Sequence, residues 1–263
     1  MTARRWLRSS QRALWACGVV IALLVLWEGS IRLFAVPNYV LPPIESVVSE
    51  FLLAPAFFLN HAIFTLTATV LGFGLAVIIG VLMAVGIVSS RVLENVFLTI
   101  LALVHSLPKI ALAPLFVLWL GTDMLPKIVI AALAAIFVIV IDVVVGMQSV
   151  DPEMVNMARA KRASASQILF KIKFPHALPN LFGALKAAVS FALIGALVGE
   201  FVGGQRGLGY VILVAQGNFD TSRAFAAILL LGIIGTALFY AVAVVETVAV
   251  PWHVSQRTRS ARR

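Results

Sequence analysis

The sequence predicts an all-α membrane protein, a polytopic bundle of about six transmembrane helices with one long loop on the cytoplasmic side. Of its 263 residues, 62% are hydrophobic and only 12% are charged, whereas a soluble domain carries about 25% charged residues. Several apolar segments reach the length of about 20 residues that a helix needs to cross the hydrocarbon core of a bilayer. The sequence also lacks the alternation of apolar and polar residues, in stretches of about ten, that marks a membrane barrel.

Six apolar segments have the length of a membrane span. We expect them to be helical because a helix satisfies its own backbone hydrogen bonds in lipid. The first segment follows basic residues, as in a signal peptide, but it shows no small-residue cleavage site and is expected to be retained. We expect one transmembrane domain over 13–250, between a basic N-terminus over 1–12 and a basic tail over 251–263. The spans are 13–35, 62–88, 93–120, 127–147, 180–202 and 225–250.

The distribution of lysine and arginine predicts the orientation of the spans, because cytoplasmic loops are enriched in these residues. If the connections alternate between sides, fourteen basic residues share the side of both termini and three lie opposite. Both termini and the largest connection, residues 148–179, are therefore expected in the cytoplasm. The fourteen are Arg4, Arg5, Arg8, Arg12, Arg91, Arg159, Lys161, Arg162, Lys171, Lys173, Arg257, Arg259, Arg262 and Arg263, and the three are Lys127, Arg206 and Arg223.

Composition and motifs exclude several classes of function. The net charge is +9, but the basic residues gather at the two ends and form no single face, so no nucleic acid is expected as a partner. Cys17 is the only cysteine and forms no intrachain disulfide. No cluster of His, Cys, Asp and Glu has metal-ligand spacing, and no phosphate-binding loop with its lysine and hydroxyl is present to hold ATP. We therefore expect no enzyme activity, and we assign no catalytic, cofactor-binding or metal-binding residue.

The third expected span is irregular. It contains His105, Pro108 and Lys109, followed by Pro114. Proline removes a helix hydrogen bond, and a lysine is costly in hydrocarbon. One interpretation is a broken helix that lines a translocation pathway. The other is a structural kink along which Lys109 reaches to the membrane surface.

Charged residues within the other spans are candidates for function, because charge inside a membrane is expensive. Asp142 lies late in the fourth span and Glu200 late in the fifth, and each fits either a pathway or gate role or a structural pairing near a span end. Glu28 and Arg32 stand four residues apart on one helix face and are expected to pair. The glycines of the second span are expected to allow close helix packing; they are Gly72, Gly74, Gly80 and Gly86.

The cytoplasmic loop over 148–179 is too long for a simple connection. Asp151-Pro152-Glu153 predicts a helix start, with a cap, a first-turn proline and an acid near the positive end of the helix dipole. A second amphipathic piece follows around Ile168, and the prolines at 175 and 179 are expected to end it before the fifth span. We expect a short helical hairpin, which either lies on anionic lipid or forms a docking surface for a cytoplasmic protein.

This loop resembles the coupling loop of the permease subunits of ATP-binding-cassette importers, the binding-protein-dependent inner-membrane components. Their pattern has Glu-Ala-Ala, then Gly, then Ile and Pro. Ala158, Ile172 and Pro175 match it, whereas Asn156-Met157 and Arg162 depart from Glu-Ala and Gly. The ATPase-docking residues that the resemblance implies are Asn156, Met157, Ala158, Arg162, Ala163, Ser164, Ile168, Ile172 and Pro175.

The resemblance covers roughly residues 38–250 and points to the taurine, nitrate and alkanesulfonate branch of these importers. Motifs in the same order along the chain support it. They are Leu41-Pro42-Pro43, the glycine-spaced stretch 72–86, residues 107–114, Trp119-Leu120-Gly121, residues 146–151 and Gly207-Leu208-Gly209.

The resemblance implies a permease subunit of the bacterial inner membrane that works by alternating access. Two copies would form the pathway for a small solute, for example an anion such as a sulfonate, taurine or nitrate. Two cytoplasmic partner subunits would bind and hydrolyse ATP, and an external solute-binding protein would deliver the substrate. Two other functions stay open. A secondary transporter is disfavoured because the sequence has few spans and no inverted repeat of broken helices, and a membrane scaffold would not need the broken third span.

Overall fold

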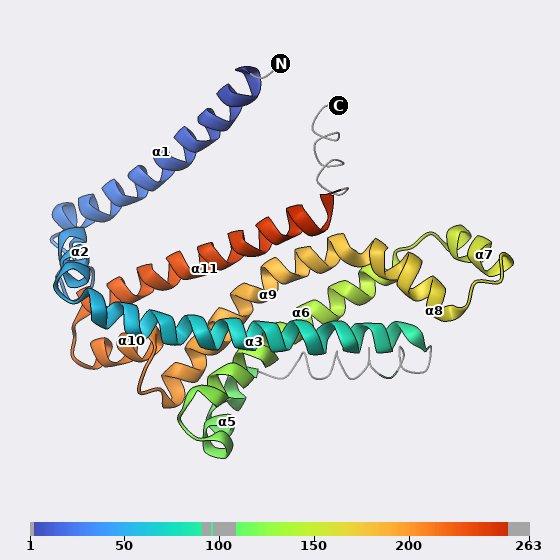
Figure 1. The fold of residues 1–263 in the computed structure, drawn as a ribbon. Coiled ribbons are helices and arrows are strands. Elements are labelled where there is room, and N and C mark those ends of the chain that lie inside the picture. The colour runs from blue at the N-terminus through green and yellow to red at the C-terminus, as the bar shows by residue number, and fades with distance from the viewer. Residues whose placement is uncertain (1–2, 91–95, 97–108, 252–263) are drawn as a thin grey trace. The chain divides into compact units, whose positions relative to one another are not determined.

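The structure is a computed structural model that describes residues 3–90, 96 and 109–251 (Figure 1). All regular elements within these ranges are helices, which confirms the predicted all-α fold. They are α1 (Ala3–Phe34), α2 (Ile44–Leu53), α3 (Pro55–Ser89), the 3₁₀ helix η1 (Lys109–Leu112), α5 (Ala113–Leu120), α6 (Met124–Gln148), α7 (Pro152–Ala160), α8 (Ala165–Ile168), the π-helix η2 (Leu169–Lys173), α9 (Phe174–Gly203), α10 (Leu208–Gly217) and α11 (Thr221–Ala249).

Four helices among the described residues are long and apolar enough to cross a membrane. They are α3, α6, the continuous segment Ala165–Gly203 and α11, and they match the second, fourth, fifth and sixth expected spans. The first expected span coincides with α1. Most of the third lies outside the described residues, including His105 and Pro108, and so does the side chain of Lys109. The total of six spans therefore stays a prediction.

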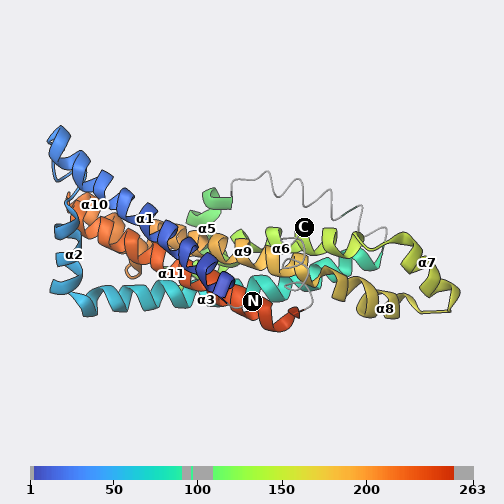
Figure 2. The ribbon, with the colours of Figure 1, turned by 90° about the horizontal axis from the view of Figure 1, so that it is seen from above.

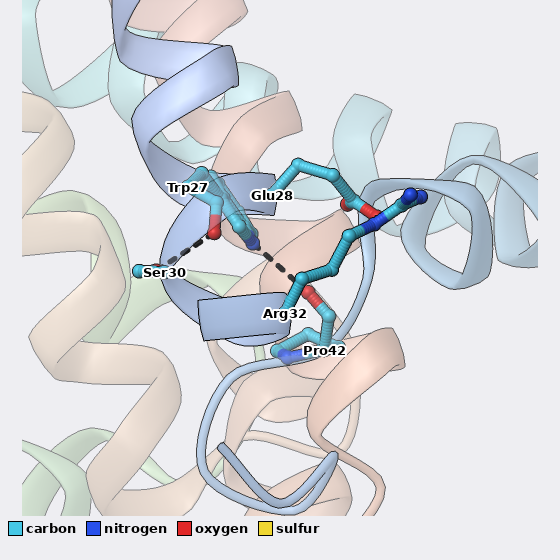
Figure 3. A network of polar contacts seen from close by, with 5 residues as sticks. All are labelled: Trp27, Glu28, Ser30, Arg32 and Pro42. Carbon is cyan, nitrogen blue, oxygen red and sulfur yellow. Dashed lines mark hydrogen bonds and ion pairs between the residues drawn. The ribbon is translucent and has the colours of Figure 1, made fainter. Parts of the chain in front are cut away.

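The chain divides into two compact units. One comprises residues 1–59 and 211–229. Within it, the indole N–H of Trp27 donates to the carbonyl oxygen of Pro42 at 2.9 Å (Figure 3), which fixes the connection after α1. Figure 3 also shows the ion pair between Arg32 Nη2 and Glu28 Oε1, at 2.9 Å. The predicted pairing of these two residues is therefore confirmed.

The second unit comprises residues 60–210 and 230–263, and its centre is the contact between α6 and α9. Small residues let these helices approach closely, because a Cβ at Gly195 of α9 would lie 2.7 Å from the Cα of Ala131 in α6. Gly72 of α3 packs against the same Ala131, and Gly80 packs against Ile139. A Cβ added at the other two glycines of α3, at 74 and 86, would meet no atom of another described helix within 4 Å. The predicted packing role thus holds for Gly72 and Gly80 only.

The expectation that two prolines end the loop before the fifth span is wrong. The helix continues without a break from Ala165 through Pro175 and Pro179 to Gly203. A turn of π-helix, Leu169–Lys173, precedes Pro175, and such wider turns accommodate locally missing helix hydrogen bonds. Each proline removes one backbone donor without ending the helix. The loop helix α8 and the membrane helix α9 are therefore one mechanical element.

The first loop helix, α7, has well-defined ends. At its start, the side chain of Asp151 accepts a hydrogen bond from the backbone N–H of Glu153 at 2.8 Å, as predicted for a capping residue. At its end, the N–H of Ala163 donates to Ala158 O at 3.0 Å and that of Arg162 to Arg159 O at 2.8 Å. This is the Schellman pattern, whose residue after the cap is usually glycine in a left-handed conformation. Arg162 fills this position with a φ of +59°.

The position of Arg162 explains why the importer pattern has glycine there, and it yields a prediction. An L-residue pays about 1–2 kcal/mol to enter the left-handed region, and glycine does not. Arg162→Gly should stabilise the end of α7 by up to about 1 kcal/mol and slow amide hydrogen exchange there up to about fivefold. Lys161→Gly, at a φ of −81°, should accelerate exchange instead. Equal exchange in Arg162→Gly and the parent would contradict this account.

Candidate functional site

The second unit has two candidate sites, one at each end of the α6–α9 pair. At the first end, α7 and α8 extend beyond the packed helices (Figures 1 and 2). Residues 149–151 join α6 to α7, and α8 runs directly into α9. The two best-packed helices of the unit therefore both lead into this loop, and a displacement of the loop would act on both.

The first half of the predicted docking set lies on α7 and the turn after it. Asn156 is exposed, and the side chain of Met157 is 57% exposed. Ala158 is half-buried, and Arg162 is exposed. An exposed methionine beside a small residue is a surface that adapts to an apolar partner. This half of the set is therefore accessible in the isolated chain.

The second half of the set is less accessible. The Ser164 hydroxyl accepts a hydrogen bond from the N–H of Gln167 at 3.2 Å, and the Gln167 side chain accepts one from the N–H of Ser164, forming a capping box that starts α8. Ile168 is buried within the chain, whereas Ala163, Ile172 and Pro175 are half-buried. Ile168 can therefore hold α8 in place but does not present a free surface.

A hollow of about 670 Å³ lies between the end of α3 and the loop helices. Apolar residues such as Val88, Val155 and Leu169 line it together with the cationic side chains of Arg159 and Lys173. Two members of the predicted docking set, Ala163 and Ile168, are among the residues that line it. The loop end of the unit therefore has exposed side chains with a hollow beside them.

The opposite end centres on Glu200 of α9, which is fully buried. The hydroxyl of Thr65 in α3 donates to Glu200 Oε1 at 2.7 Å, and the backbone N–H of Gly209 donates to Oε2 at 2.7 Å. Thr65 in turn accepts a hydrogen bond from the N–H of Leu208 at 2.9 Å. Hydrogen bonds to a carboxylate are among the stronger ones in proteins. Glu200 thus clamps α3 and the start of α10 to α9.

The loop after α9 depends on glycine at this clamp. Gly207 has a φ of +106°, and a Cβ there would overlap the carboxylate of Glu200. Its N–H donates to Nδ1 of His61 at 3.0 Å, and the His61 ring stacks on Tyr210 with ring centres 6.0 Å apart. The glycines noted in the sequence therefore make room for a buried carboxylate.

Lys127 is also fully buried, in the first turn of α6. Its ammonium group donates to the carbonyl oxygen of Thr122 and to that of Gly203, the latter at 3.2 Å. Lys127 thus links the connection between α5 and α6 to the end of α9. The sequence analysis counted Lys127 among the basic residues of the connections between spans, whereas the structure places its side chain inside the bundle.

The structure does not bring together the sequence-based candidates for a pathway or gate that lie among the described residues. Glu200 takes part in the structural clamp, and Asp142 lies half-buried near the other end of α6. His105 and Pro108 fall outside the described residues, as does the side chain of Lys109. The two described carboxylates therefore do not share one site.

Sequence reasoning missed an ion pair between two membrane-spanning helices. Lys186 Nζ of α9 contacts Glu246 Oε2 of α11, and both side chains are largely buried. It also missed Thr65 and His61, the partners of the clamp. A charge inside an apolar segment is itself a sign of function, so Lys186 and Glu246 could have been found from the sequence, although their pairing could not.

The long apolar helices define a polytopic membrane protein, whose helices α7 and α8 extend beyond the packed bundle of the second unit. The family described as "Binding-protein-dependent transport system inner membrane component" matches residues 76–248. This match covers more than half of the chain, and the protein belongs to that family. It is the permease subunit of an ATP-binding-cassette importer for a small solute.

Relatives match over nearly their whole lengths. A riboflavin transport system permease protein of Chloroflexus aurantiacus is 35% identical over 94% of this chain and 95% of its own. A formylaminopyrimidine transport permease protein of Halalkalibacterium halodurans is 31% identical over 95% of this chain and 100% of its own. A taurine transport system permease protein of Escherichia coli is 26% identical over 95% of this chain and 93% of its own.

A solved structure shares the fold. The MetNI methionine ABC transporter in an inward-facing conformation matches with a TM-score of 0.65, covering 74% of this chain and 97% of the matched chain. The identity is 20%, so the likeness concerns the arrangement of helices alone. It supports the predicted fold of an importer permease.

The clamp at Glu200 leads to a prediction with a matched control. Thr65→Val keeps the shape of the side chain but removes one donor from a buried carboxylate and the acceptor for Leu208, at a cost of about 1–3 kcal/mol. The loop that contains Arg206 should open more often, and trypsin should cleave after Arg206 about tenfold faster. Thr67→Val is the control, because among the described residues the Thr67 hydroxyl donates to Ile63 O in its own helix, at 2.7 Å, and to no other helix. Equal cleavage of the two variants would contradict the clamp.

Proposed function

We propose that this permease works as one of two copies that form a pathway by alternating access. Two cytoplasmic subunits bind and hydrolyse ATP, and an external solute-binding protein delivers the substrate. The observation that carries the proposal is the exposed loop helix α7, joined through its turn to a helix that continues unbroken into the membrane. The loop and the membrane span are joined by continuous helix from Ala165 to Gly203.

The docking residues divide into two roles. Asn156, Met157 and Arg162 are exposed and would contact the ATP-binding subunit. Ala158 is small and half-buried, so it would allow a partner side chain to approach the helix closely. Ile168 is buried and would keep α8 anchored. With this division, the ATP-binding subunit would contact the exposed residues of α7, and the buried Ile168 would make α8 move together with the bundle.

The close packing of α6 and α9 provides the path from the loop to the far end of the unit. A Cβ at Gly199 would lie 3.1 Å from the Cα of Lys127, and the one at Gly195 approaches Ala131. Packed interfaces of this kind move as rigid bodies. We infer that displacement of the loop shifts the Glu200 clamp together with the two helices. Asp142 and Lys109 remain candidates for the pathway itself, as do His105 and Pro108, which lie outside the described residues.

The substrate is a small solute, and we propose an anion such as a sulfonate, taurine or nitrate. Relatives named for aliphatic sulfonates, taurine and nitrate support this class. A second candidate is a nitrogen heterocycle, favoured by the higher identity to relatives named for riboflavin and formylaminopyrimidine. Uptake of radiolabelled taurine into proteoliposomes, with unlabelled nitrate or riboflavin as competitor, separates the two classes.

The docking proposal predicts the effect of a charge on α7. Ala158→Asp would bury a carboxylate without a partner in the interface with the ATP-binding subunit, at a cost of several kcal/mol, enough to weaken docking by orders of magnitude. The variant should insert into the membrane normally, lose the ATP-binding subunit during purification and lose uptake. Lys161→Ala, at an exposed position, should change little. Retention of both the partner and uptake in Ala158→Asp would leave the loop as a helix on the lipid surface.

The charge distribution predicts the orientation of the chain in the inner membrane, with both termini in the cytoplasm. In a background lacking Cys17, a single cysteine at Asn218 should react with a membrane-impermeant thiol reagent in intact cells. A cysteine at Ser164 should react only after the cells are permeabilised, and both positions are exposed in the chain. Labelling of position 164 but not 218 in intact cells would reverse the proposed orientation.

A further inference from the structure

The ion pair between Lys186 and Glu246 joins two membrane-spanning helices, α9 and α11. The side chains are 16% and 6% exposed, which makes it the least exposed of the four ion pairs among the described residues. The cost of two charges in an apolar environment calls for a role that an apolar contact could not fill.

An ion pair differs from an apolar contact in the register that it imposes. Apolar side chains of two helices exchange neighbours at little cost when the helices slide, because one hydrocarbon contact resembles the next. A buried ion pair loses its partner in such a movement, and an uncompensated buried charge is strongly destabilising. The pair therefore holds α9 and α11 at one relative position along their axes.

The location of the pair ties α11 to the element that carries loop movement. Lys186 lies twelve residues after Phe174, the first residue of α9, which is about 18 Å along the helix axis. The helix that contains it is unbroken back to Ala165. Glu246 lies three residues before Ala249, the last residue of α11. The pair thus joins the end part of α11 to the half of α9 that is nearer to the loop.

Among the described residues, few other contacts hold α11 against α9. Small residues lock α9 to α6, whereas little of α11 is buried within this chain. Gly235 of α11 faces Leu193 of α9, with an added Cβ 3.1 Å from Leu193 Cδ2. Of the described residues, Lys186 and Glu246 provide the directional contact between the two helices.

We propose that Lys186 and Glu246 are a positioning pair, which makes α11 follow α9 when the ATP-binding subunits displace the α7–α8 loop. This rests on the proposed function, since it names a residue pair through which ATP hydrolysis is coupled to solute movement. Neither residue contacts the solute. Loss of the pair leaves docking and hydrolysis intact but lets α9 move without α11.

The test measures solute transported per ATP hydrolysed in proteoliposomes that contain the full importer with its binding protein. The double variant Lys186→Met/Glu246→Leu replaces the pair by apolar side chains and leaves no unpaired charge, so it is expected to fold. It should retain the ATP-binding subunit and hydrolyse ATP, but its transport per ATP should fall about tenfold or more. Each single variant that folds, Lys186→Met or Glu246→Gln, should show the same loss of transport per ATP.

The reversed pair, Lys186→Glu/Glu246→Lys, should regain most of the transport per ATP, because it restores the attraction with the charges exchanged. Arg32→Met is the control. It breaks the Arg32–Glu28 ion pair within one helix, where Arg32 is 78% exposed, and should leave the ratio unchanged. An apolar double variant with the parent's transport per ATP would overturn the proposal, as would a folded reversed pair that stays uncoupled.

The same assay keeps the two proposals apart. A parent complex that shows no ATP-dependent uptake refutes the proposed function. A parent complex that transports, together with an apolar double variant that transports equally well, refutes only the positioning role of the pair.

Discussion

A membrane bundle must supply partners for its own polar groups, because hydrocarbon provides neither donors nor acceptors. Among the described residues, no buried side-chain nitrogen or oxygen lacks a hydrogen-bond partner. Glu200 is held by Thr65 and by Gly209, and Lys127 is held by backbone carbonyls. Lys186 and Glu246 satisfy each other. These contacts determine which helices are tied together and at which points.

The remaining contacts between helices are formed by small side chains. Ala131 meets Gly72 from α3 and Gly195 from α9, so three helices come together at one residue of α6. Without hydrophobic attraction between helices in lipid, close approach through small residues is the main source of packing energy. Helices packed in this way have few alternative arrangements, and they therefore suit a unit that moves as a body between two states.

The proposed coupling depends on the continuity of the helix that leads from the loop into the membrane span. The helix is unbroken from Ala165 to Gly203 although it contains Pro175 and Pro179. α8 and α9 are therefore one helix, and the loop is a continuation of the core of the second unit. The proposed coupling from loop to α9, and from α9 to α11 through Lys186, follows from this continuity.

The sequence by itself determined the features that depend on neighbours in the chain. Apolar length set the spans, Asp151 capped α7 because its side chain reaches a backbone N–H two residues away, and Glu28 met Arg32 across one helical turn. The resemblance at the loop identified the class of protein. Only the tertiary structure decided the partners of Glu200, since Thr65 lies 135 residues away, and those of Lys186, 60 residues from Glu246. Spacing along one helix predicts a shared face, but which face of another helix it meets depends on the packing of the whole bundle.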